Sequence, residues 1–188
     1  MFLHLPISMT VTSRTFRHAL LIALVSVATS PLHAEEPPAL DGTWQLVPAE
    51  STDSSPWNAC RLTISIRKDK VTLARHFGAG RRTFEDSFTF TTDDTETIVP
   101  SVYWPENRHL GAYMSDEQQR RMRATWLDEQ RILRVNTDLV LSTQQGERAV
   151  NVLSNYQVSR DGQRLTIVEL RSTRTRPIVF VFSRVTSP

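Results

Sequence analysis

Apolar and polar residues alternate with a period of two over most of the chain between residues 40 and 184. The clearest stretch is 61–67 (RLTISIR), in which Leu62, Ile64 and Ile66 share one side and the hydroxyl residues share the other. Because successive side chains of a β-strand point to opposite faces, this alternation predicts strands with one buried face. Further alternating segments are residues 43–47, 71–76, 84–90, 121–126, 132–141, 150–158, 165–171 and 178–184.

Short polar turns separate these segments. Asp161-Gly162 is the strongest hairpin signal, and Asp69-Lys70 and residues 78–80 mark two earlier turns. Helical periodicity is nearly absent, although residues 116–120 are compatible with one helical turn. About eight to ten strands joined by hairpin-length turns predict an all-β sandwich or barrel. We favour an antiparallel up-and-down β-barrel, because closure removes the exposed edges of the sheet.

The first 34 residues differ from the rest of the chain. Residues 19–30 form a short apolar run that follows Arg14 and Arg17 and precedes small residues up to Ala34. A basic start, a short apolar core and a small final residue are typical of a cleaved secretory signal, and a membrane-spanning helix needs about 20 apolar residues. We therefore predict a signal peptide over 1–34 and a barrel domain over 35–188. This implies a periplasmic or secreted protein without a membrane span after cleavage; the alternative is an uncleaved N-terminal anchor.

Removal of the signal changes the charge of the chain. The whole chain has 22 basic and 20 acidic side chains, and the predicted signal contains two of the basic ones, Arg14 and Arg17, and no acidic one. The remaining chain is formally neutral, so the sequence pI near 9.0 does not indicate nucleic-acid binding. The chain has a single cysteine, Cys60, which excludes an internal disulfide. The fold must therefore be stabilised by burial and hydrogen bonding.

Three motifs mark the two ends of the predicted barrel domain. They are Gly42-Thr43-Trp44 in the first strand, the hairpin of residues 156–166, and the terminal strand 180–184 (FVFSR). Together with the meander, they resemble the lipocalin/calycin superfamily, and within it the secreted bacterial lipocalin-like proteins. The resemblance implies that Trp44 plugs one end of the barrel and that Arg184 stacks on its indole, as a structural closure with Gly42 and not as a catalytic site. The chain departs from well-studied lipocalins in lacking disulfides and a clear C-terminal helix, and in a long irregular segment, 98–118.

Several charged and polar side chains fall on the predicted inward faces of the strands. Buried charges are costly unless they are paired, so we predict ion pairs between Arg75 and Asp86 and between Arg171 and Glu169. The alternative is that strand ends or bulges turn these charges to the solvent. A ligand cup with a few polar groups in an apolar wall would use the same positions, and Tyr156 shares the inward face of its strand.

The irregular segment 98–118 is too apolar to be a free linker. Tyr103 and Trp104 either form a lid over the barrel mouth or pack as a flap on the outer wall. With the lid included, the candidate ligand-binding residues are Arg75, Asp86, Tyr103, Trp104 and Tyr156.

Motifs for catalysis and metal binding are missing from the sequence. There is no G-x-S-x-G, no H-E-x-x-H and no glycine-rich phosphate loop. His76, His109 and Cys60 do not show the spacing of metal ligands. The basic clusters 120–123 and 171–176 predict solvated faces, with a phosphate- or lipopolysaccharide-binding patch as the alternative.

Three functional hypotheses follow. The first is non-catalytic binding of a small apolar or amphipathic molecule in the barrel, without cofactor, metal or nucleic acid. The second is an envelope interaction protein with a filled barrel, whose outer surface contacts envelope lipid or protein. The third is a weak hydrolase or isomerase, in which Asp86 and Glu169 would form a pair of catalytic carboxylates.

Overall fold

The computed structural model describes residues 39–52, 57–104 and 112–186. These residues belong to one unit, Glu35–Pro188, and form strands with one short 3-10 helix, η1. The predicted signal 1–34 and part of the segment 98–118, including His109, lie outside the described residues. The elements in chain order are β1 (Gly42–Leu46), η1 (Pro48–Glu50), β2 (Ala59–Arg67), β3 (Lys70–Ala79), β4 (Arg82–Thr91), β5 (Thr97–Pro100), β6 (Tyr113–Met114), β7 (Gln119–Leu127), β8 (Ile132–Thr143), β9 (Gly146–Val158), β10 (Arg164–Arg171) and β11 (Ile178–Arg184).

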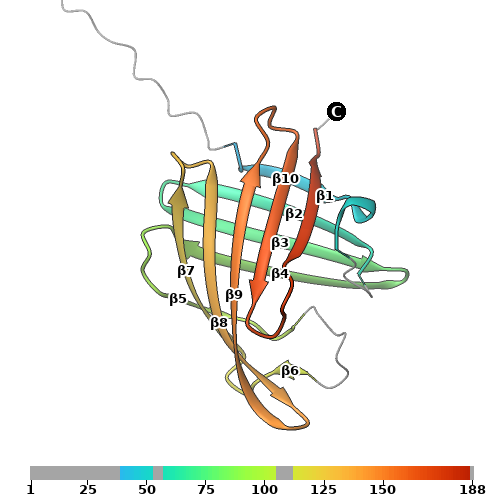
Figure 1. Ribbon diagram of the computed structural model, residues 1–188, viewed down its shortest axis with the longest axis vertical. Helices are drawn as coiled ribbons and strands as arrows, with labels where there is room; N and C mark the ends of the chain where they lie inside the picture. Colours follow the sequence, from blue (N-terminus) through green and yellow to red (C-terminus); the bar gives the residue numbers. More distant parts are fainter. Residues whose placement is uncertain (1–38, 53–56, 105–111, 187–188) are drawn as a thin grey trace, which may run out of the picture. The chain divides into compact units, whose positions relative to one another are not determined.

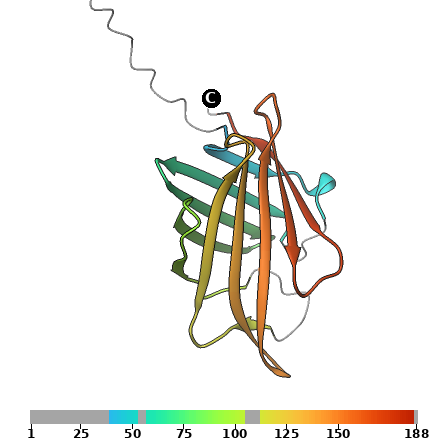
Figure 2. The same cartoon turned by 60° about the vertical axis from the view of Figure 1, so that its left-hand side comes forward.

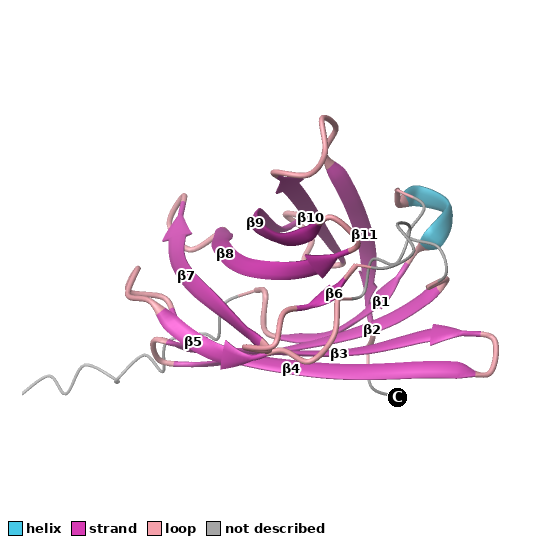
Figure 3. Cartoon of the chain, turned by 90° about the horizontal axis from the view of Figure 1, so that it is seen from below, coloured by secondary structure: helices cyan, strands magenta, loops and turns pink. Residues whose placement is uncertain are grey.

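The strands form one antiparallel sheet that curls into a nearly closed barrel (Figures 1 and 3). The order is β4-β3-β2-β1-β11-β10-β9-β8-β7-β5, and β6 pairs with β8. Figure 2 shows the wall of β8–β11 crossing the wall of β1–β4. This confirms the predicted all-β, lipocalin-like up-and-down barrel. The ladder ends at β4 and β5, so among the described residues these two strands meet without ladder pairing and leave one seam in the ring.

The predicted alternation decides which side chains face the barrel interior. In β2, Leu62, Ile64 and Ile66 are buried, whereas Arg61 and Thr63 between them are exposed. A shift of the pairing by one residue would move the apolar set to the solvent side, so the burial of these side chains also fixes the register of the strand.

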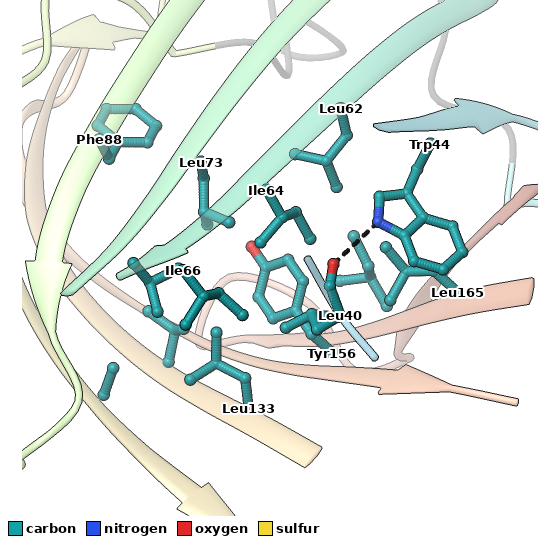
Figure 4. Packing of buried hydrophobic residues seen from close by; sticks show 14 of the residues in the cluster. Leu40, Trp44, Leu62, Ile64, Ile66, Leu73, Phe88, Leu133, Tyr156 and Leu165 are labelled. Carbon is teal, nitrogen blue, oxygen red and sulfur yellow. Dashed lines mark hydrogen bonds between the residues drawn. The ribbon is translucent and has the colours of Figure 1, made fainter. Parts of the chain in front are cut away.

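Apolar side chains from nearly every strand fill much of the interior. Trp44, Leu133 and Leu165 are completely buried at the centre of the main cluster, and Figure 4 shows them packed with the side chains of β2. A second cluster around Trp104 and Leu139 joins β8 and β9. The polar residues described below lie where these two clusters meet.

The first and last strands close the ring by pairing with each other. Trp44 lies directly opposite Arg184 in the ladder, and the Arg184 guanidinium lies 4.1 Å from the centroid of the Trp44 ring. Arg184 also donates hydrogen bonds to the carbonyl oxygens of Gly162 (2.6 Å) and Asp41 (2.9 Å). The Trp44 Nε1 donates to the Leu40 carbonyl at 3.1 Å. The indole and guanidinium predicted to meet therefore do so, and their polar groups are satisfied.

Gly42 leaves the space that Arg184 occupies. Its φ is +135°, a conformation that residues with a Cβ rarely adopt. A Cβ at this position would lie 2.6 Å from Arg184 Nη1. The glycine of the Gly42-Thr43-Trp44 motif is thus required by both the backbone and the closing arginine.

The predicted helical turn at 116–120 is wrong. Residues 116 and 117 form a turn, and β7 begins at Gln119. The segment pairs with its neighbours instead: Arg120 faces Leu139 of β8 and Val99 of β5 in the two ladders. Nothing among the described residues forms a helix long and apolar enough to cross a membrane.

Candidate functional site

Two small cavities lie in the barrel interior. The first, named here the apolar cavity, has a volume of about 70 Å³ and is lined largely by apolar side chains. The second, the polar cavity, has a volume of about 50 Å³. Four polar side chains line both cavities and therefore lie between the two cavities. These four, together with Asp86 and Arg120, are called the polar belt. The belt consists of Arg75, Asp86, Arg120, Tyr156, Glu169 and Arg171.

The size of the cavities limits what they can hold. A buried water needs about 10–15 Å³ of cavity volume. The apolar cavity therefore has room for roughly five water-sized groups, and the polar cavity for roughly four. Pockets for drug-sized ligands measure about 300–1,000 Å³. The interior as folded therefore accepts only a small ligand, and a larger one would have to displace side chains.

Arg75 and Asp86 form the predicted ion pair. They lie opposite each other in the β3–β4 hairpin, and Arg75 Nε donates to Asp86 Oδ1 at 2.7 Å while Nη2 donates to Oδ2. The Arg75 guanidinium also lies 5.1 Å and 5.2 Å from the ring centroids of Phe77 and Phe88. Burial opposes the charged form of Arg75, but the Asp86 carboxylate outweighs this effect and raises the pKa of the guanidinium. The Arg75 guanidinium is therefore charged, and two hydrogen bonds to Asp86 hold it inside the barrel.

Arg171 and Glu169 form the second predicted pair. They are two residues apart on β10 and so share a face, and Arg171 Nε and Nη2 donate to Glu169 Oε2 at 3.0 and 2.6 Å. The two side chains are only 8% and 12% exposed, which excludes the alternative that strand ends turn these charges to the solvent. Burial raises the pKa of Glu169, and the positive charges of Arg75 and Arg120 act against that rise.

Tyr156 stands between the two cavities. It lies in β9, is 8% exposed, and lines both cavities; Figure 4 shows its ring among the core side chains. Burial raises the pKa of its hydroxyl, which the nearby Glu169 charge raises further. The hydroxyl is therefore neutral, and among the described residues no hydrogen bond to it is formed. A polar group placed in this way is available to a ligand.

Trp104 faces the barrel interior, whereas Tyr103 is half-buried and packs on two other aromatic rings. Trp104 is 9% exposed and lines the polar cavity, and the Arg171 guanidinium lies 5.1 Å from its ring. Tyr103 lines neither cavity, but its ring packs 4.1 Å from that of Phe84 and 6.4 Å from that of Trp57, which lines the apolar cavity. That these two residues contact a ligand remains a prediction.

Arg120 contradicts the expectation of a solvated basic face at 120–123. Its neighbours Arg121 and Arg123 are exposed, but Arg120 is only 7% exposed and lines the polar cavity. The reason is the strand itself: Arg120 is two residues before the buried Met122 and shares its inward face. The same correction applies to Arg171 in the cluster 171–176, which points into the barrel.

Cys60 is a buried thiol beside the apolar cavity. It is 4% exposed and lines that cavity. Burial raises its pKa to about 12, which the positive charge of Arg75 partly offsets. Because the thiolate is the reactive form, Cys60 is expected to react slowly in the folded protein.

This predicts a slow reaction of the native protein with a thiol reagent. At pH 8 the raised pKa leaves roughly a thousandfold less thiolate than an ordinary cysteine has. We expect Ellman's reagent to label Cys60 at a rate lower by about that factor in buffer than in denaturant. A native rate within tenfold of the denatured rate would show that the thiol is accessible.

No group of three or more histidine, cysteine or acidic side chains among residues 39–52, 57–104 and 112–186 is placed to hold a metal ion. Asp86 and Glu169 are each bound to an arginine of their own, which is not the arrangement of two carboxylates that share a reaction. The chemistry that the belt offers is recognition of a charged or hydrogen-bonding group.

Comparisons with known proteins find similar solved structures but no match in sequence. No family model and no curated protein matches its sequence. Similar solved structures include secretory abundant heat soluble protein 4 from Ramazzottius varieornatus, with a TM-score of 0.48, 11% identity, and coverage of 79% of this chain and 96% of that chain. A mutant of the REP1-NXSQ fatty acid transporter has a TM-score of 0.47 and 10% identity, with coverage of 78% of this chain and 98% of that chain. Human cRBP IV has a TM-score of 0.41 and 14% identity, with coverage of 78% of this chain and 98% of that chain. Identities and TM-scores this low do not assign a function to this chain.

Proposed function

We propose that this protein is an exported barrel that binds a small, partly apolar ligand in its interior and does not catalyse a reaction. The observation that carries the proposal is the pair of cavities divided by the polar belt. Burying charged groups costs several kcal/mol per ion before pairing, and an apolar interior would stabilise a purely structural barrel at least as well. Polar groups placed at cavities in an apolar wall are instead the ordinary composition of a ligand site.

Export is supported by the N-terminal sequence. Residues 1–34 have the basic start, short apolar run and small final residue of a secretory signal. Expression of the full chain in a bacterium, followed by the intact mass of the purified protein, tests this directly. A mass that begins at Glu35 supports export with cleavage, and a mass that retains the first 34 residues contradicts the cleavage.

Ligand binding can be tested with one variant that fills a cavity and one that does not. Ile178 is buried and lines the apolar cavity, whereas the next residue, Val179, is on the opposite face of β11 and partly exposed. Native mass spectrometry of the purified wild type is expected to show a bound small molecule, or binding of added indole, hexanoate or hexanamide. Ile178→Trp should weaken that binding at least tenfold, and Val179→Trp should leave it unchanged.

The proposal fails if the wild type purifies without a ligand and binds none of these probes. If both variants bind as the wild type does, the ligand lies outside the apolar cavity, and binding there is excluded. Among the described residues, large exposed apolar side chains include Ile98 in β5, Val102 in the segment after β5, and Tyr113 in β6. Single exposed apolar residues are normal on soluble proteins, so the interaction hypothesis gains less support.

A further inference from the structure

The polar cavity is lined by a buried cation, Arg120, for which the described residues provide no salt-bridge partner. Arg120 is 7% exposed, and its guanidinium donates from Nε to Ser101 Oγ at 2.6 Å and from Nη2 to the Tyr103 carbonyl at 3.0 Å. It lies 4.7 Å from the ring centroid of Phe88 and 6.0 Å from that of Trp104. All of these contacts are to neutral groups, and no carboxylate among the described residues forms a salt bridge with it.

The neighbouring arginines differ in this respect. Arg75 is bound to Asp86, and Arg171 is bound to Glu169. A buried charge without a directly bound counter-charge is unfavourable. Burial and then the charge of Arg75 lower the pKa of Arg120 to about 10, and the carboxylates of Asp86 and Glu169 act against this without contacting it. The side chain nevertheless stays protonated at neutral pH. Among the described residues the polar belt therefore carries three guanidinium groups and two carboxylates.

A second donor faces the same cavity. Tyr156 is buried, its hydroxyl is neutral, and it donates to no described residue. It lines the polar cavity together with Arg120, and so do the apolar side chains of Met122, Leu139 and Val152. An anion held there would find a cation and a hydroxyl on one side and a hydrocarbon wall on the other.

We propose that the polar cavity binds the carboxylate of a short aliphatic acid, with Arg120 as its counter-charge and the Tyr156 hydroxyl as a second donor. The proposal rests on the proposed function and names the chemical class of the ligand. One excess positive charge fits a monoanion, and a planar carboxylate suits the fork of a guanidinium. The polar cavity has room for roughly four water-sized groups, which fits a carboxyl group with a short chain and not a phosphate ester. A longer chain would pass Tyr156 into the apolar cavity.

Matched acids and amides test this inference, because they differ in charge and hardly in shape. Uniformly ¹⁵N-labelled mature protein is titrated with butanoate, butanamide, hexanoate and hexanamide, and the Nε–H signals of Arg120 and the indole signal of Trp104 are followed. We expect each acid to bind the wild type at least tenfold more tightly than its amide. Arg120→Gln should reduce this preference to less than threefold, and Tyr156→Phe should weaken acid binding several-fold. Arg121→Gln, an exposed arginine on the same strand, is the control and should keep the full preference.

The outcomes separate this inference from the proposed function. Equal binding of acid and amide overturns the anion site while leaving a binding barrel in place. Binding of none of the probes overturns both. An unchanged preference in Arg120→Gln, or a lost preference in Arg121→Gln, overturns the assignment of the counter-charge to Arg120. If Arg120→Gln fails to fold, the comparison of acid with amide in the wild type and in Tyr156→Phe still decides whether the polar cavity binds a carboxylate.

Discussion

An Asp86→Ala variant is expected to lose about 3–5 kcal/mol of the free energy of unfolding, because removal of one partner leaves the other as an uncompensated buried charge. The Arg75 side chain is 19% exposed and makes both of its charged hydrogen bonds to Asp86. Without that carboxylate, Arg75 would have to remain unpaired in the barrel or the hairpin would have to open. Urea denaturation followed by tryptophan fluorescence measures the loss.

Glu85, the next residue on β4, provides the matched control. Its side chain is 75% exposed and, within the described part of the chain, bonds only to His76, so Glu85→Ala should change stability by less than about 0.5 kcal/mol. Replacing both partners, as Arg75→Met with Asp86→Leu, should recover most of the lost stability, since a well-packed apolar pair is often as stable as a buried ion pair. A loss for Asp86→Ala no greater than that for Glu85→Ala would show that the pair is not buried in solution.

Truncation of the closing indole should be about as severe. Trp44 is completely buried, and large-to-small substitutions of buried aromatic residues cost about 3–5 kcal/mol. Trp44→Ala would also remove the ring on which Arg184 stacks and the hydrogen bond to the Leu40 carbonyl. We expect a loss in this range, measured as a shift of the urea midpoint at unchanged slope.

Trp126→Ala is the control that separates the loss of the closing contact with Arg184 from the loss of an indole elsewhere. It is only partly buried and packs at the side of the main cluster, so Trp126→Ala should cost clearly less than Trp44→Ala. Trp44→Phe should fall between them, because it keeps most of the apolar area but loses the hydrogen bond, which is worth about 1 kcal/mol. Equal losses for the two alanine variants would mean that Trp44 has no special place in the barrel.

Local rules account for the parts of the site that could be predicted from the sequence. Gly80 and Arg81 form the turn between β3 and β4, and from the pair Ala79–Arg82 the register counts back to Arg75 opposite Asp86. Once the turn and the inward faces are known, the ion pair follows. The contact of Trp44 with Arg184 was predicted differently, from the resemblance of the two terminal motifs to the lipocalin/calycin superfamily.

Arg120 shows where such reasoning fails. The alternation that places Met122 inward also places Arg120 inward, but an arginine in a run of basic residues is usually on the surface. What keeps it inside is a hydroxyl and a carbonyl from Ser101 and Tyr103, 19 and 17 residues earlier in an irregular segment. No period or turn signal specifies that contact. Trp57, beside the apolar cavity, is similarly unpredictable because it precedes β2 in a segment without alternation.

The pairing of β1 with β11 has a consequence for how the molecule forms. Hydrogen bonds such as that from Val47 N to Val181 O join residues at opposite ends of the described chain. These contacts join residues that are far apart in the sequence. The chain therefore loses conformational entropy in bringing its ends together before burial of Trp44 compensates for that loss, and folding should be slow for a protein of this size. A chain that stops short of its last strand would leave the edges of β1 and β10 bare. Completion of synthesis is thus a condition for the native state, and truncated products should be substrates for proteases or aggregate through those edges.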